Sequence, residues 1–137
     1  MIGTGAGISD AIHPHFVARG TYDFASQGGA VSTISLGVTI PDNAVVVRAW
    51  YEVLTALTSG GAATIALDIP TDDAAGLLAA EAIATAGAAG LHECIQTGAA
   101  ANFSNKCTAA RALSMTIAVA ALTAGKLVLW AEYVVSD

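Results

Sequence analysis

The chain has 137 residues, of which 55% are hydrophobic but only 12% are charged, about half the charged share of a typical soluble domain. The net charge of −6 and the scatter of the five basic residues argue against nucleic-acid binding, which needs clustered positive charge. The uncharged stretch from Arg111 to Lys126 is shorter than the roughly 20 apolar residues of a membrane-spanning helix, so insertion into a membrane is not expected.

The first 20 residues are rich in glycine and show no sustained hydrophobic periodicity. They predict an extended N-terminal arm over residues 1–20, placed before a single β-sandwich domain over residues 21–137. Within this arm Ile8, Ile12 and Phe16 are isolated apolar residues that a solvated tail would not need. We expect these side chains to contact a partner protein when the arm becomes ordered on binding.

Alternation of apolar residues predicts strands along most of the remaining chain. A short strand is expected at 21–25, and Ile34, Leu36, Val38 and Ile40 mark a half-buried strand over 30–40. After the turn Pro41–Asn43, a long strand over 45–58 is predicted to form a hairpin with 62–70 through Ser59–Gly61.

The middle of the chain is rich in alanine and less regular. Asp72 or Asp73 is expected to cap a helix of one or two turns through "AAGLLAAEAI", because a carboxylate is favoured at the positive end of the helix dipole. Residues 91–97 predict another short strand, and residues 98–107 predict a loop.

Two further strands follow, over 113–119 and 127–135, joined by a predicted turn at Thr123–Lys126. Seven or eight strands with Gly or Pro turns predict an all-β fold. We expect an antiparallel β-sandwich of jelly-roll type, with at most one short helix.

The last predicted strand is apolar on both of its sides. Leu127 and Leu129 face one way, whereas Val128, Trp130 and Val134 face the other. A strand covered on one side only would leave Trp130 in water. We therefore expect Trp130 to lie between two sheets or in a contact with a neighbouring subunit, and the shortage of charge favours such an oligomer.

Residue patterns for chemistry are weak throughout. His13 and His15 stand two apart without further ligands nearby, and His92 with Cys94 lacks an orienting acid. We therefore predict a protein that is not an enzyme, with no catalytic, cofactor or metal site.

Trp50 and Trp130 leave two alternatives open, because such residues serve either interfaces or sugar-stacking platforms. Two cysteines form no disulfide framework and suggest reduced thiols in a cytosolic product. The first basic residue is Arg19, so no secretory signal is expected.

Five stretches share the pattern of a known family: "TYDFASQGGAVSTISLG", "IPDNAVVVRAWYEVLT", "ATIALDIPTDDAAGLL", "IQTGAAANFSNKCTAAR" and "LTAGKLVLWAEYVVSD". From about Thr21 onward the chain resembles small virion proteins of tailed bacteriophages, of the capsid decoration, cement or head-fibre type. The resemblance implies a non-enzymatic role on the capsid surface, a homotrimer, and the major capsid protein as partner. It transfers no functional residues, and it leaves head or tail placement open. The alternative is a carbohydrate-binding or adhesion module of a phage head fibre or tail.

Overall fold

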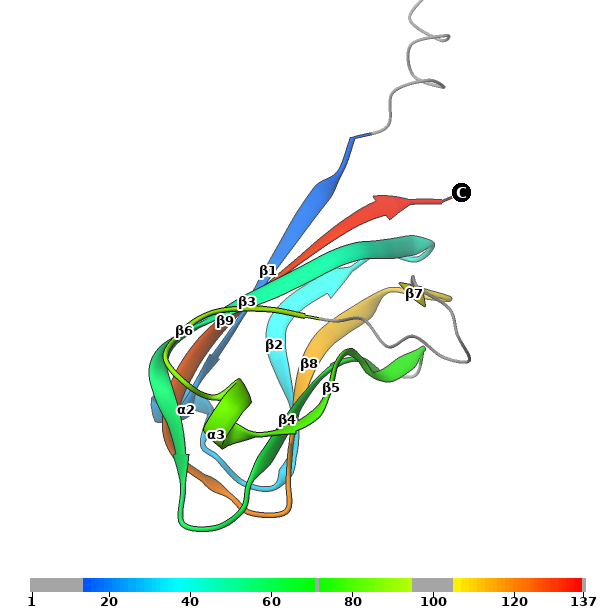
Figure 1. Cartoon of the computed structure of the whole chain (residues 1–137). Helices are drawn as coiled ribbons and strands as arrows, with labels where there is room; N and C mark the ends of the chain where they lie inside the picture. The colour runs from blue at the N-terminus through cyan, green and yellow to red at the C-terminus, as the bar shows by residue number, and fades with distance from the viewer. Residues whose placement is uncertain (1–13, 71, 95–104, 137) are drawn as a thin grey trace, which may run out of the picture.

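A computed structural model describes residues 14–70, 72–94 and 105–136 (Figure 1). The elements of this part of the chain are, in order, β1 (Phe16–Asp23), α2 (Phe24–Gln27), β2 (Ser32–Ile40), β3 (Ala44–Ser59), β4 (Thr64–Ile69), β5 (Asp73–Ala82), α3 (Ile83–Ala86), β6 (Gly90–Glu93), β7 (Asn105–Lys106), β8 (Arg111–Ala118) and β9 (Leu122–Val135).

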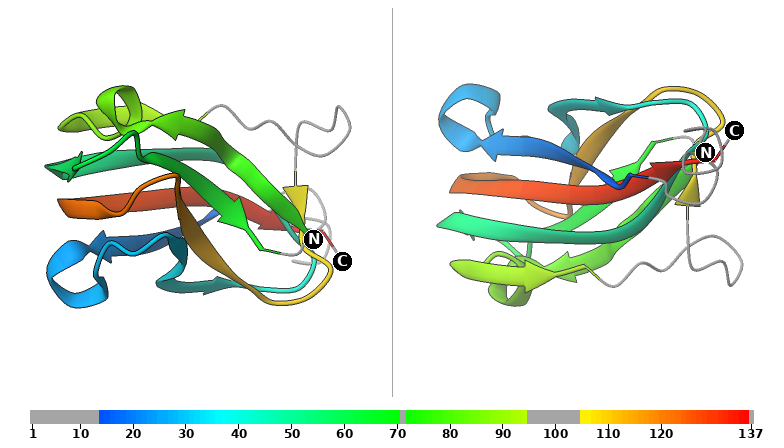
Figure 2. Two further views of the ribbon diagram at one scale, coloured as in Figure 1. Left: turned by 90° about the horizontal axis from the view of Figure 1, so that it is seen from below. Right: turned by 90° about the horizontal axis from the view of Figure 1, so that it is seen from above.

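The strands form two antiparallel sheets that pack face to face. One sheet has the strand order β1-β9-β3-β6, with β7 also pairing with β3, and the other has the order β2-β8-β4-β5. Seen from above, the first four lie side by side in that order (Figure 2). Among the eight longer strands, every connection except the β4–β5 hairpin passes from one sheet to the other. The predicted antiparallel sandwich is therefore confirmed, and its strand order is that of a jelly roll. The predicted hairpin between residues 45–58 and 62–70 is wrong, because β3 and β4 lie in different sheets and pair with other strands.

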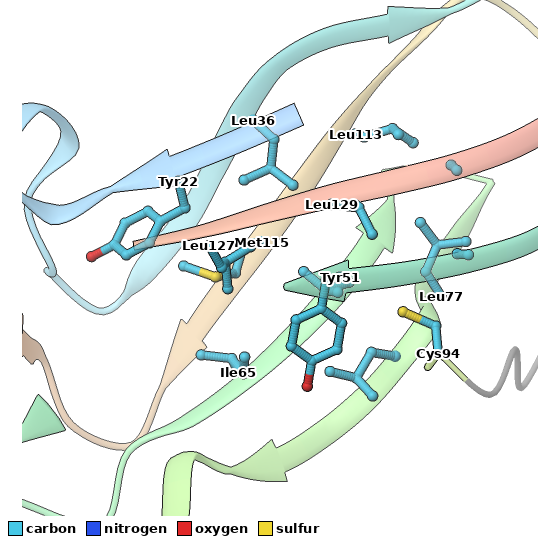
Figure 3. Packing of buried hydrophobic residues seen from close by; sticks show 14 of the residues in the cluster. Tyr22, Leu36, Tyr51, Ile65, Leu77, Cys94, Leu113, Met115, Leu127 and Leu129 are labelled. Carbon is cyan, nitrogen blue, oxygen red and sulfur yellow. The ribbon is translucent and has the colours of Figure 1, made fainter. Parts of the chain in front are cut away.

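The hydrophobic core fills the space between the sheets (Figure 3). Its largest fully buried side chains include Tyr22, Tyr51, Ile65, Leu77, Leu113, Met115, Leu127 and Leu129. The two tyrosines direct their hydroxyls to backbone carbonyls, Tyr22 to Gly28 at 2.7 Å and Tyr51 to Ala86 at 2.9 Å. A buried hydroxyl needs such a partner, and here each one fastens a single-turn helix to the sandwich.

β9 is an inner strand of its sheet, between β1 and β3. Its predicted alternation is confirmed, because Leu127, Leu129 and Ala131 are fully buried in the core. The intervening residues face away from the second sheet. Among these, Trp130 is half-buried and Val128 is buried on the outward side.

The helix predicted after Asp72 is wrong. Residues 73–82 form β5, which pairs with β4 at the edge of the second sheet. Leu77 of this strand is fully buried and Leu78 nearly so. Burial against the sandwich therefore overrides the helix preference of an alanine-rich segment. The two single helical turns lie elsewhere, at Phe24–Gln27 and Ile83–Ala86.

The turn before β9 was also predicted at the wrong place. Residues 123–126 belong to β9, and the chain reverses at Val119–Ala121 instead. Val119 adopts a φ of +71°, which is unusual for a β-branched residue. Gly125 lies within the strand with a φ of +140°, close to Leu57 of β3, where the β3–β9 register shifts.

β1 begins inside the predicted arm. Phe16 pairs with Tyr133 and Gly20 with Leu129, so residues 16–20 are part of the sandwich. Ile8 and Ile12, the other predicted contact residues of the arm, lie outside the described residues.

Candidate interaction surface

The sheet β1-β9-β3-β6 has an outer face, made by the residues that point away from the core. The outer face carries Val17, Arg19, Arg48, Trp50, Glu52, Leu91, Glu93, Val128, Trp130 and Glu132. Within the described part of the chain, no further layer of secondary structure lies over this face (Figure 2). It is therefore the broad surface on which a partner could cover the apolar residues of β9.

Two tryptophans form the centre of the outer face. Trp50 of β3 lies directly opposite Trp130 of β9, and their rings stack with centroids 6.3 Å apart and an interplanar angle of 14°. The guanidinium carbon of Arg48 lies 4.7 Å from the centroid of the Trp50 ring. Aromatic and cation–π contacts of this kind hold the rings in one orientation, which lowers the entropy that a binding partner must remove.

Charged residues surround the tryptophan pair. Arg48 Nε lies 4.0 Å from Glu93 Oε1, and His15 Nδ1 lies 3.1 Å from Glu132 Oε2. The Arg48–Glu93 pair is well exposed to solvent, and His15 is half exposed beside a partly buried Glu132, so the two pairs contribute little to stability. Charges of both signs at the margin of an aromatic centre are typical of a protein–protein interface.

Exposed apolar side chains extend the outer face beyond the tryptophans. Leu91 is 72% exposed and Val17 is 54% exposed. Phe16, at the start of β1, is 45% exposed as well, but it lies on the opposite side of the sheet, with Ala18 and Tyr22, and stacks there on Tyr133 with centroids 5.5 Å apart. Apolar side chains grouped in this way on one sheet mark a contact surface more strongly than isolated exposed ones do.

Trp130 does not lie between the two sheets, so that part of the prediction is wrong. It lies on the outer face, where the structure brings it against Trp50. Cover by a neighbouring subunit stays a prediction. The sequence left Trp50 open as a residue of an interface or a sugar platform, but Trp50 was not among the residues predicted to contact a partner. The structure places it on the same side of β3 as Arg48 and Glu52. The missing information was the register that sets Trp50 opposite Trp130.

Stacking within the chain also bears on the sugar-platform alternative. A sugar ring binds to the free face of an aromatic side chain. Trp50 and Trp130 each use ring surface on the other, and Arg48 covers part of Trp50. This arrangement favours the interface reading of the two tryptophans over the sugar platform.

Cys94 and His92 have the environment of structural residues. His92 stacks on Tyr51 with centroids 4.8 Å apart, and its Nε2 lies 2.7 Å from the carbonyl oxygen of Ala88. Burial raises the pKa of the Cys94 thiol to about 12, and burial raises the pKa of Cys107 to about 11. Both thiols are therefore protonated at neutral pH, which makes them poor nucleophiles.

The described residues contain no group of three His, Cys, Asp or Glu side chains arranged to hold a metal ion. None of their helices has the length and apolar character needed to cross a bilayer.

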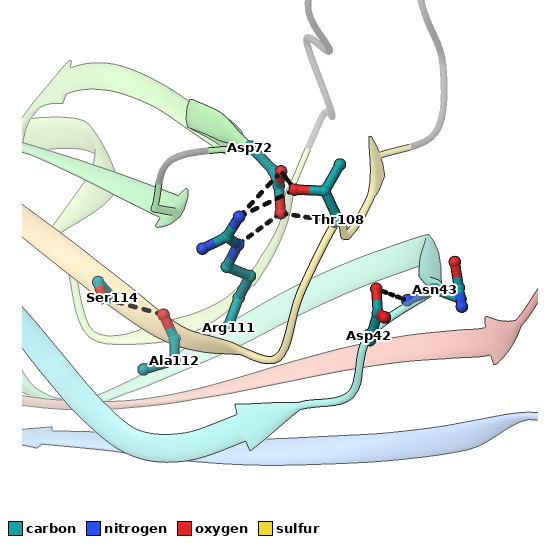
Figure 4. A network of polar contacts seen from close by, with 7 residues as sticks. All are labelled: Asp42, Asn43, Asp72, Thr108, Arg111, Ala112 and Ser114. Carbon is teal, nitrogen blue, oxygen red and sulfur yellow. Dashed lines mark hydrogen bonds and ion pairs between the residues drawn. The ribbon is translucent and has the colours of Figure 1, made fainter.

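A polar cluster around Asp72 fastens the β4–β5 connection to the segment before β8 (Figure 4). The Asp72 carboxylate accepts hydrogen bonds from Arg111 Nε at 2.7 Å, from Thr108 Oγ1 at 2.6 Å and from the Thr108 backbone N–H at 3.1 Å. The bond from Arg111, followed by those from Thr108, lowers the pKa of Asp72 to about 2. The cluster is a structural clamp between two connections of the sandwich.

The lowered pKa of Asp72 predicts a stability contribution that depends on pH. Because the folded-state pKa lies below the unfolded value of 3.8, the contribution is complete above about pH 4 and is lost as the pH falls toward about 2. We expect Asp72→Asn to lower the free energy of unfolding at pH 6 by on the order of 1 kcal/mol more than at pH 2, after allowing for solvent screening. Urea denaturation at both pH values measures this difference.

The control for this prediction is Asp42→Asn, which removes a carboxylate from the exposed β2–β3 turn. Its effect on unfolding should change less between the two pH values. A difference between wild type and Asp72→Asn that stays constant with pH would contradict the role of the ionised carboxylate.

Comparison with solved structures finds the same fold in bacteriophage capsids. The chain matches a chain of the acid-stable capsid of Helicobacter pylori bacteriophage KHP30 with a TM-score of 0.62 and 15% identity, covering 92% of both chains. It matches a chain of the cyanophage Pam1 capsid asymmetric unit with a TM-score of 0.65 and 18% identity. A chain of the capsid of Ralstonia phage GP4 gives a TM-score of 0.61 and 24% identity. Each of the last two matches covers 90% of this chain and 86% of the other.

Identities of this size establish a shared fold, and the matches extend over nearly the whole chain. No protein-family model and no curated protein matches the sequence.

Proposed function

We propose that the protein is a non-enzymatic structural component of a bacteriophage virion that decorates and stabilises the capsid surface. The outer face of the sheet β1-β9-β3-β6 carries this proposal. It presents a stacked tryptophan pair with exposed apolar neighbours, on a fold that occurs in chains of three phage capsid structures. We place the protein on the virion after synthesis in the host cytoplasm, with the major capsid protein as its partner.

The same surface supports self-association. A chain with 12% charged residues has a limited polar surface, and the outer face exposes the apolar side chains that would gain most from cover. A homotrimer fits this proposal because in a closed ring every subunit covers the contact surface of a neighbour, and because threefold symmetry matches the local threefold positions of a capsid. A stable contact of this kind buries roughly 800 Å² on each subunit.

The start of β1 extends the proposal to the N-terminal arm. Phe16 lies at the beginning of β1 and keeps 45% of its surface exposed, although it is stacked on Tyr133. We propose that the arm, with Ile8 and Ile12 as its apolar residues, runs from this point onto a neighbouring subunit or onto the shell beneath.

Single charge substitutions test whether the outer face makes these contacts. Trp130→Glu and Leu91→Glu each place a carboxylate on the face, while Val31→Glu makes the same change at an exposed valine between α2 and β2. Light scattering at micromolar concentration reports the oligomer, and co-sedimentation with capsid shells lacking this protein reports binding. Circular dichroism checks that each variant is folded.

We expect the wild type and Val31→Glu to form the oligomer and bind the shells. The two outer-face variants should dissociate and lose most of the binding, because a carboxylate buried without a partner is strongly unfavourable. A monomeric wild type that does not bind shells would refute the proposed function. Outer-face variants that behave like the wild type would instead move the contact to another surface.

A further inference from the structure

The sandwich has an open side between β5 and β6, the outermost strands of the two sheets. On the opposite side β1 and β2 lie against each other and close the sandwich. On the open side a pocket of about 520 Å³ extends inward between the two edge strands. This volume lies within the range of sites that bind small molecules or single side chains of a partner.

The walls of the pocket combine apolar, aromatic and acidic groups. Leu78 and two neighbouring alanines of β5 supply apolar surface, and His92 stacked on Tyr51 supplies an aromatic wall. Glu81 of β5 pairs with the core residue Ile65, so its side chain lies on the inward side of the second sheet. Glu93 of β6 lies at the rim of the pocket, and its side chain belongs to the outer face.

The charge of the pocket selects the class of its occupant. Of the described residues that line it, two are glutamates and none is lysine or arginine. Glu93 already faces Arg48 on the outer face, with Arg48 Nε and Glu93 Oε1 4.0 Å apart, so Glu81 is the carboxylate available to an occupant. An anionic ligand would be repelled here, and a purely apolar one would leave the Glu81 carboxylate desolvated. A cation with an apolar stem can pair its charge with the carboxylate while its stem packs on the apolar lining.

Among such cations, arginine fits better than lysine. Its planar guanidinium donates to carboxylates in a fixed fork and stacks on aromatic rings, and its methylenes pack on apolar surface. The Glu81 carboxylate and the His92 ring offer partners for both properties.

β5 provides a way to hold the rest of the partner. It is the outermost strand of its sheet, and Ala79 and Ala80 beside the pocket are exposed. An edge strand with small side chains accepts an added strand through backbone hydrogen bonds, while pockets for alternate side chains provide specificity. We propose that the pocket between β5 and β6 receives an arginine side chain from an extended segment of a partner protein that lies along β5. This inference does not depend on the capsid role.

Titration of the full-length, ¹⁵N-labelled protein with a capped pentapeptide of sequence Thr-Val-Arg-Val-Thr tests the proposal. A second peptide carries citrulline, the uncharged isostere, in place of arginine, and a third carries lysine. We expect saturable amide shifts at Ala79, Ala80, Glu81 and Glu93 with the arginine peptide. The citrulline peptide should bind about tenfold more weakly, because it lacks the charge that the glutamates recognise, and the lysine peptide should fall between them.

Variants that remove one negative charge test which carboxylate accounts for the preference for the arginine peptide. Glu81→Gln should weaken the arginine peptide about tenfold and abolish most of its advantage over citrulline. Glu93→Gln should have a smaller effect, because the Glu93 side chain lies at the rim and faces Arg48. Glu52→Gln makes the same charge change on the outer face, outside the pocket lining, and should bind as the wild type does. The proposal is overturned if the arginine and citrulline peptides bind equally, or if the lysine peptide binds more tightly than the arginine peptide. It is also overturned if Glu81→Gln binds the arginine peptide as the wild type does, or if the wild type shows no saturable shift.

Discussion

Replacing Leu129 with alanine is expected to lower the free energy of unfolding by about 3 kcal/mol, measured by urea denaturation. Leu129 is fully buried in β9, opposite Tyr51 on one side and Gly20 on the other. Glycine has no side chain that could move into the space left behind. The substitution therefore removes apolar contacts and leaves a cavity between the sheets, which are the two sources of the loss.

Leu91→Ala is the matched control, since it deletes the same atoms from a leucine that is 72% exposed on the neighbouring part of the same sheet. Its effect on the folded monomer should stay within about 0.5 kcal/mol. Similar losses for the two leucines would contradict the assignment of the inward and outward sides of this sheet.

Replacing Gly125 with alanine is expected to destabilise the protein by about 3 kcal/mol, because two separate effects act at this residue. The φ of +140° is a conformation that residues with a side chain rarely adopt. A Cβ at this position would also collide with the Leu57 side chain and come within 3.1 Å of Leu57 Cα. Thermal and urea unfolding of the variant measure the combined effect.

Gly60→Ala provides the control, since a Cβ there meets nothing within 4 Å and the φ is not in the left-handed range. Its stability should equal or slightly exceed that of the wild type. The double variant Leu57→Ala, Gly125→Ala separates the two effects. It should lose less stability than the sum of the single variants, because the collision with the leucine side chain disappears while the backbone strain remains. Strict additivity would show that the collision contributes nothing.

Strands with one polar side were the part of the fold that could be predicted from the sequence. β2 and β8 alternate clearly because the sandwich buries one side of each, as Leu36, Leu113 and Ile117 illustrate. The number and spacing of the predicted strands led to the jelly-roll expectation, and the strand order of the two sheets agrees with it.

β5 and the start of β9 could not be predicted, because tertiary contacts decide both. Alanine-rich residues 74–83 favour a helix in isolation, yet the burial of Leu77 and the pairing with β4 hold most of them extended. Gly125 suggested a turn, but it serves a close approach to Leu57 within a strand. The actual turn at Val119–Ala121 contains none of the residues that usually mark one.

The candidate surface and the pocket depend on contacts between segments far apart in the sequence. The sequence indicated the outward side of Trp130, but the Trp50–Trp130 stack requires the β3–β9 register, which bulges interrupt at several points. The pocket requires β5 and β6 to lie at the same side of the sandwich although they belong to different sheets. Patterns of residues along the sequence predict neither the β3–β9 register nor the placement of β5 and β6 on the same side.

The inner position of β9 has a consequence for folding during translation. β9 is the last of the strands to leave the ribosome, yet β1 and β3 both pair with it and are separated by it. Until it emerges, these two strands lack the neighbour that joins them, whereas the β4–β5 hairpin is local and can pair early. The nascent chain therefore carries an incomplete sheet with apolar edges until β9 emerges. Pairing across such long sequence separations is slow, and its intermediates are prone to aggregation, so the first sheet forms only after translation of β9 is complete.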